Sequence, residues 1–133
     1  MLLDDLADLL SSGGITTTAY RGFMPEQPDD AIQLIETGGM APLRAMSCGP
    51  GRALERPGIQ IVRRSPSYER ARVEMQVIWR MLDGLGDRTL NGTRYLWFAA
   101  SQQPFPLGRD DSNRTLIAMN VGVVKDPSTA TST

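Results

Sequence analysis

The sequence predicts an α+β fold in which two helices pack on a mostly antiparallel sheet. One observation is an apolar stripe at helical spacing that begins at Tyr68. A second is a set of short segments in which apolar and polar residues alternate, as they do in strands. A third is the Asn91-Gly92 pair, which favours a tight hairpin. The predicted order is helix, strand, strand, loop, strand, helix, strand, strand, in one domain over residues 1–125.

Residues 2–11 are expected to form a short amphipathic helix. Their leucines recur at three- and four-residue spacing. Asp4, Asp5 and Asp8 are placed on the opposite, solvent-facing side. Acidic residues in the first turn also suit the positive end of the helix dipole. The Ser-Ser-Gly-Gly run at 11–14 is expected to end this helix.

Three strands and a long loop are expected next. The segment 38–56 contains four glycines and two prolines without any clear period, so it is predicted to be a long loop. Its glycines do not form a phosphate-binding motif, because no Gly-Lys-Ser/Thr follows them. The strands are expected at 19–24, 31–37 and 58–64.

The second helix is the clearest signal in the sequence, and its apolar stripe runs from Tyr68 to Leu85. Ser65 is expected to cap its N-terminus and Pro66 to occupy its first position. Gly84 and Gly86 are expected to end it. Trp79 lies off the stripe and would widen the core face or meet an interface. The stripe consists of Tyr68, Ala71, Met75, Ile78, Leu82 and Leu85.

The last part of the chain predicts two strands at 94–101 and 115–124. They are expected to pair antiparallel across a charged loop at 102–114. The polar residues 126–133 predict a disordered tail.

The composition excludes several classes of enzyme. The 133 residues include no histidine and one cysteine, Cys48, so histidine-activated nucleophiles, His-ligated zinc and thiolate clusters are excluded. Carboxylate chemistry remains as the option for a small hydrolase. However, Asp110 and Asp111 are adjacent, and adjacent side chains on an extended chain point apart. We therefore expect no catalytic residue, cofactor or metal.

Charge and hydropathy also limit the partners. The net charge is −1. Acidic residues are interleaved with the arginines around the second helix, which are Arg63, Arg64, Arg70, Arg72 and Arg80. That pattern is typical of a solvated helix face with local ion pairs, and it argues against nucleic-acid binding. No apolar run reaches the ~18 residues of a membrane span. The acidic N-terminus argues against a signal peptide, and the single cysteine favours a reducing compartment.

Two features indicate contact with other subunits. Trp97 and Phe98 face opposite sides of one strand, so one of them would meet a surface outside the core. The charged loop carries two residues of each sign, and this self-complementary set would pair with a neighbouring subunit. A solvated hairpin loop explains the same charges equally well.

Five motifs, in this order and spacing, resemble the minor capsid protein family of tailed phages, whose members look like tail terminator or tail completion proteins. The resemblance covers residues 1–125. The motifs are LLDDLADLL (2–10), GFMPEQPDDAIQLIETGG (22–39), PGIQIVRRSPSYERAR (57–72), LDGLGDRTLNGTRYL (82–96) and QPFPLGRDDSNR (103–114).

The resemblance implies a structural virion protein that is not an enzyme. Its subunits would form a hexameric ring that caps the tail tube and joins it to the head connector. DNA would pass through the lumen without specific binding, and assembly would take place in the host cytoplasm. The loop at 38–56 would contact the tube or the next subunit, and the loop at 102–114 would contact a neighbouring subunit or ring.

Nine residues in the two predicted loops and in the strand predicted at 94–101 are candidate interface residues. They are Met46, Arg52, Arg56, Trp97, Phe105, Arg109, Asp110, Asp111 and Arg114.

Two alternative functions remain. One is a head-completion or neck adaptor protein of the same connector, and the other is a small non-viral binding module.

Overall fold

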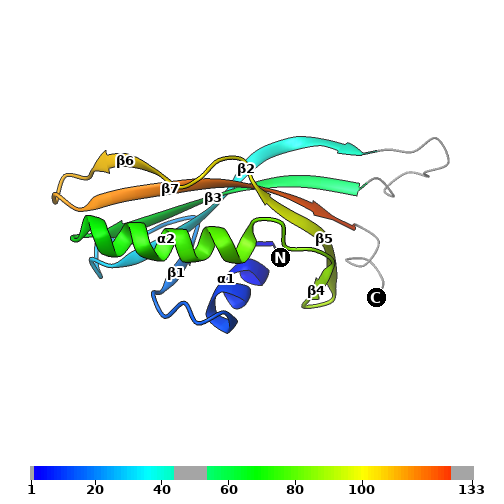
Figure 1. The fold of residues 1–133 in the computed structure, drawn as a ribbon, viewed down its shortest axis with the longest axis horizontal. Helices are drawn as coiled ribbons and strands as arrows, with labels where there is room; N and C mark the ends of the chain where they lie inside the picture. Colours follow the sequence, from blue (N-terminus) through cyan, green and yellow to red (C-terminus); the bar gives the residue numbers. More distant parts are fainter. Residues whose placement is uncertain (1, 44–53, 127–133) are drawn as a thin grey trace.

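Two helices lie beneath one curled, seven-stranded sheet in the computed structural model, which describes residues 2–43 and 54–126 (Figure 1). The helices cover one face of the sheet, and both pack against its strands. The elements are α1 (Leu2–Ser12), β1 (Ala19–Arg21), β2 (Ala31–Leu43), β3 (Leu54–Ser65), α2 (Tyr68–Leu82), β4 (Arg88–Leu90), β5 (Thr93–Ala100), β6 (Phe105–Arg109) and β7 (Thr115–Lys125).

The strands follow the order β1-β2-β3-β7-β5-β4, and β6 pairs with β7 next to β5. The short β1 is parallel to β2, whereas the other pairs are antiparallel. The predicted α+β class with a mostly antiparallel sheet is therefore confirmed. The predicted pairing of 94–101 with 115–124 is also confirmed, with Phe98 opposite Val123. The predicted element order is incomplete, because it lacks β4 and β6.

The long loop predicted at 38–56 is wrong at both of its ends. Strand β2 continues to Leu43 and β3 begins at Leu54, with Met40 opposite Arg56. Bulges interrupt this pairing, and Gly39 has a φ of 62° there. A Cβ at Gly39 would lie 2.3 Å from the Arg56 carbonyl oxygen, so the strands need a glycine at this position. Residues 44–53 lie outside the described residues.

The loop predicted at 102–114 contains a strand. β6 pairs with the first half of β7, and Arg109 lies opposite Thr115. Pro106 and Gly108 conceal this strand in the sequence, because both residue types are rare within strands. A bulge separates these two residues, so the usual alternation is also broken.

Helix α1 differs from its prediction at Asp5, which is buried and not exposed to solvent. The Tyr95 hydroxyl and Asn91 Nδ2 donate hydrogen bonds to the Asp5 carboxylate, the latter at 2.7 Å. These donors replace the water that an exposed carboxylate would bind, so the charge is accommodated inside the fold.

Helix α2 begins and ends differently from the prediction. Ser67, not Ser65, is the N-cap, and its Oγ accepts a hydrogen bond from the Arg70 N–H at 3.3 Å. Ser65 belongs to β3. The helix ends at Leu82, so Leu85 follows it and forms a β-bridge to Phe98. Tyr68 is exposed, although it was expected on the buried stripe.

The core lies between the helices and the sheet. The buried stripe of α2 contacts the alternating apolar residues of β3 and β7. A bulge in β5 between Tyr95 and Trp97 places both Tyr95 and Phe98 on the helix side, with their ring centroids 5.4 Å apart. No helix in the described part of the chain has the length and apolar character to cross a membrane.

Candidate functional site

The face of the sheet opposite the helices is the first candidate surface. Strand alternation brings Gly58, Gly122 and Ala99 to this face, in register across β3, β7 and β5. None of the described helices covers it, because α1 and α2 both lie on the other face (Figure 1). Trp97 stands on the same face and is 58% exposed.

These residues line a groove on the open face with a volume of ≈560 Å³. The lining includes the small residues Gly58, Gly122 and Ala99 and the exposed side chains of Met40 and Trp97. Any side chain at Gly58 would collide with Thr37, since its Cβ would lie 2.2 Å from the Thr37 Oγ1. An exposed tryptophan beside a groove is typical of a protein interface. We call this surface, with Arg56 at its edge, the sheet groove.

The outer side of α2 is the second candidate surface. Val73 and Val77 are 64% and 44% exposed, although both are apolar. Val73 points away from the sheet, because it lies on the opposite side of the helix from Ala71 and Met75. We call the surface of Glu69, Val73 and Val77 the helix ridge.

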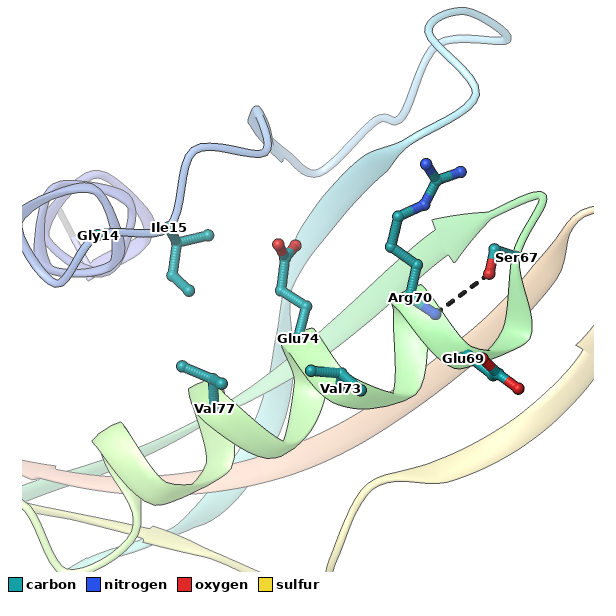
Figure 2. Close-up of a pocket in the computed structure, with 8 residues that line it drawn as sticks. All are labelled: Gly14, Ile15, Ser67, Glu69, Arg70, Val73, Glu74 and Val77. Carbon is teal, nitrogen blue, oxygen red and sulfur yellow. Dashed lines mark hydrogen bonds between the residues drawn. The ribbon is translucent and has the colours of Figure 1, made fainter.

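A cleft of ≈580 Å³ separates the helix ridge from the segment that follows α1. Figure 2 shows Val73, Val77 and Glu74 on α2, with Ile15 across the cleft from them. Arg70 projects from the same helix near its N-terminus. The cleft therefore adds apolar surface beside the ridge.

The charged hairpin tip between β6 and β7 makes its contacts mostly within itself. Asp110 accepts hydrogen bonds from the backbone N–H groups of Arg114 at 2.9 Å and Ser112 at 3.1 Å. The Arg114 N–H holds the pKa of Asp110 below its usual value. Arg109 donates to the Asn113 carbonyl oxygen at 3.1 Å. The tip is thus a preformed turn, and Arg109 and Asp111 are exposed on it.

Arg114 does not project from this tip, since its side chain is only 4% exposed. It forms ion pairs with Asp110 at 2.9 Å, Glu26 at 2.9 Å and Asp29 at 3.2 Å. Arg64, from β3, donates to the carbonyl oxygen of Pro25 at 2.7 Å. These two arginines fix the turn at 25–30. Arg114 therefore has its contacts within the chain, and we do not carry it into the proposed interface.

Arg63 forms a second internal cluster, on the helix side of β3. Its side chain is 2% exposed and lies 2.7 Å from Glu74 and 3.1 Å from Asp30. The interpretation of Arg63 and Arg64 as part of a solvated face is therefore wrong. The sequence does contain a signal for Arg63, because strand alternation places it in the same row as the core residues Ile59 and Ile61.

The other candidates occupy three different places. Trp97 and Arg56 line the sheet groove. Phe105 is half-buried in β6 opposite Ala118. Met46 and Arg52 lie outside the described residues. Met40, Val73 and Val77 form surfaces that were not predicted from the sequence. Valines at i and i+4 outside the buried stripe of a helix are nevertheless a readable sign of a second apolar face.

The acidic side chains of the described residues are mostly engaged in internal ion pairs. The described part of the chain has no group of three or more His, Cys, Asp or Glu residues that could hold a metal ion. The carboxylates of Glu26, Asp30, Glu74 and Asp110 are paired with arginines. The arrangement can bind other surfaces through the sheet groove and the helix ridge.

Comparisons with known proteins identify the relatives of this fold. A family model described as bacteriophage tail terminator protein matches residues 5–126. A chain from the virion of a native gene transfer agent particle matches with a TM-score of 0.59 and 12% identity, over 88% of this chain and 84% of that chain. At that identity the likeness shows a shared fold. No curated protein matches the chain.

Proposed function

The chain belongs to the bacteriophage tail terminator family, and from this premise we propose that it forms a ring that caps the finished tail tube. As a member of that family it is a structural, tail-related protein of a phage particle. The observation that carries the ring proposal is the open sheet face, where Trp97 is 58% exposed beside the groove. A monomer would leave this apolar surface in water, whereas a ring would cover it.

We further propose that the ring contains six copies and lies at the neck, between the tail tube and the head connector. DNA would pass through its lumen without specific binding. The net charge of −1 supports this, because a lumen that gripped phosphates would be strongly basic. The partners of the ring would be the tail tube protein and a head-completion protein.

Different residues would serve different contacts in this ring. Trp97 and Arg56 would lie between subunits, because they line the sheet groove. Arg109 and Asp111 would contact an adjoining ring, because the β6–β7 turn projects at one end of the long axis of the molecule (Figure 1). Phe105 begins β6, at the other end of that strand from the turn, and we propose that it adds to the same contact. Two different partners would thus meet two different parts of the subunit.

A nonsense mutation in the gene tests the proposed function in the particle-producing host. Without the terminator, we expect electron micrographs to show tails of abnormal and variable length that lack heads. Expression of the wild-type chain from a plasmid should restore tails of uniform length. Loss of a head-completion protein would instead leave tails of normal length without heads, so that result would contradict tail termination.

A further inference from the structure

We propose that the subunits join head to tail, with the helix ridge of one copy seated in the sheet groove of the next. This inference rests on the proposed function, because it identifies the two faces that meet in the ring. It assigns a role to Val73 and Val77, which the fold leaves exposed. It also names a second copy of this chain as the occupant of the sheet groove.

The positions of the two surfaces support a head-to-tail contact. A ring of identical subunits closes through heterologous interfaces, so each subunit must present two different surfaces that fit each other. The sheet groove faces away from the helices, since its residues alternate with those of the core. The helix ridge faces away from the sheet, opposite the buried Ala71, Met75 and Ile78. The surfaces therefore lie on opposite sides of the subunit.

The shapes of the two surfaces also correspond. Val73 and Val77 are one helical turn apart and form an exposed apolar surface that borders the cleft toward Ile15. The sheet groove is lined by Gly122 and Ala99, whose small size leaves room for a helix, whereas the Thr37 side chain already fills the space over Gly58. Trp97 would pack along the side of the inserted helix, where a large aromatic group contributes strongly to binding.

One pair of opposite charges favours this contact. Among the described residues that line the sheet groove, Arg56 is the one that carries a formal charge. The helix ridge begins at Glu69, which is exposed and has no ion pair within the described part of the chain. Arg56 already has an interaction in its own chain, and in the ring it would in addition pair with Glu69 of the next copy at one end of the contact.

Mixing two variants tests the head-to-tail arrangement. Val73→Asp places a carboxylate on the helix ridge alone, and Trp97→Asp places one in the sheet groove alone. Under the conditions in which the wild type forms rings, alone or on tail tubes, each variant should lose at least about tenfold in ring population, because a buried unpaired carboxylate opposes the contact. In a 1:1 mixture, the intact ridge of Trp97→Asp can bind the intact groove of Val73→Asp. The two surfaces that remain in this pair are both altered, so the mixture should form heterodimers and nothing larger.

Native mass spectrometry provides the readout, with matched controls. Phe23→Asp removes another exposed apolar residue outside both surfaces, and it should form rings like the wild type. Thermal melts should show that all three variants fold, because the three side chains are exposed in the monomer. Normal rings of either Val73→Asp or Trp97→Asp, or a mixture that stays monomeric, would overturn the inference.

Cysteine trapping provides a second, independent measurement. In a Cys48→Ser background, a chain carrying both Val73→Cys and Ala99→Cys should give a reducible ladder of covalent multimers once rings are oxidised. Each single-cysteine chain should remain monomeric on the same gel. Three results would overturn the inference and leave the proposed ring intact. They are rings that give no ladder, a dimer formed by Val73→Cys alone, and trapping of tail tube protein by Ala99→Cys. A wild-type chain that never forms rings would overturn both.

Discussion

Arg63 lies inside the fold because two carboxylates and a backbone carbonyl meet its guanidinium group. It donates to Glu74 at 2.7 Å, to Asp30 at 3.1 Å and to the carbonyl oxygen of Arg64. Thr17 donates to the other oxygen of Glu74 at 3.1 Å, which links the segment after α1 to this cluster. A buried charge is tolerated only when it is paired in this way.

Arg63→Met should lower the free energy of unfolding by about 2–4 kcal/mol, because Glu74 and Asp30 would lose their shared partner. Urea denaturation of purified protein measures this change. Arg70→Met is the matched control, since Arg70 pairs with the same Asp30 at 3.4 Å but is exposed. We expect its effect to stay within about 0.5 kcal/mol. Equal effects of the two substitutions would contradict the internal role of Arg63.

Asp30 should make the stability sensitive to acid. Burial raises the pKa of Asp30, but hydrogen bonds from Ser65 and Arg63 and the charges of nearby arginines together lower this pKa by more. The net pKa therefore lies below the usual 3.8. A lowered pKa in the folded state gives stability that is present above pH 3.8 and is lost as the pH falls through the folded-state pKa. Asp30→Asn should therefore flatten the loss of stability below about pH 4. Identical acid profiles for variant and wild type would contradict this.

At the scale of elements, the β4–β5 hairpin depends on its turn residues. Asn91 and Gly92 have φ values of 50° and 84°, as a tight hairpin turn with positive φ at both central positions requires. The turn also positions Asn91, whose Nδ2 reaches Asp5 and Asp8 on α1 at 2.7 and 3.0 Å. The hairpin thereby joins the edge of the sheet to the first helix.

Gly92→Ala should lower the free energy of unfolding by about 1–2 kcal/mol, because an L side chain is strained at positive φ. Apart from its chain neighbours, no atom of the described residues lies within 4 Å of the added Cβ, so the cost is that of the backbone alone. Gly86→Ala also has open space and lacks the positive φ, so its stability should match that of the wild type in the same thermal melts. A neutral Gly92→Ala would show that the turn changes its conformation.

The elements that the sequence predicts well are those whose burial follows a period. The stripe of α2 and the alternation in β7 are regular because each faces one continuous core. Strand β6 and the outer parts of β2 and β3 are held by backbone pairing across bulges, and their glycines and prolines hide any period. The sequence therefore suggests loops where the structure has strands.

The same reason applies to the candidate surfaces. Alternation in β5 predicts that either Trp97 or Phe98 leaves the core, and the structure shows that it is Trp97. The sheet groove depends on register, because Gly58, Gly122 and Ala99 come together only through pairing across three strands. Register between distant strands is not readable from one sequence.

At the scale of the whole molecule, the β6–β7 tip should matter for docking rather than for ring closure. Arg109 and Asp111 are exposed at this tip, and neither of them lines the sheet groove or belongs to the helix ridge. A chain with both residues changed to alanine should form normal rings and bind tail tubes or connectors several-fold more weakly, by co-sedimentation. Gln102→Ala with Gln103→Ala is the control, since both glutamines are exposed in the segment between β5 and β6, outside the tip. Lost rings would contradict this division of roles.

The central claim is that this chain forms a ring at the end of a tail tube. Native mass spectrometry or mass photometry of the purified chain, with and without its tail tube protein, tests it most directly. The account predicts either a ring in solution or a monomer that assembles into a ring on the tube. A chain that stays monomeric and does not respond to the tube protein would contradict tail termination.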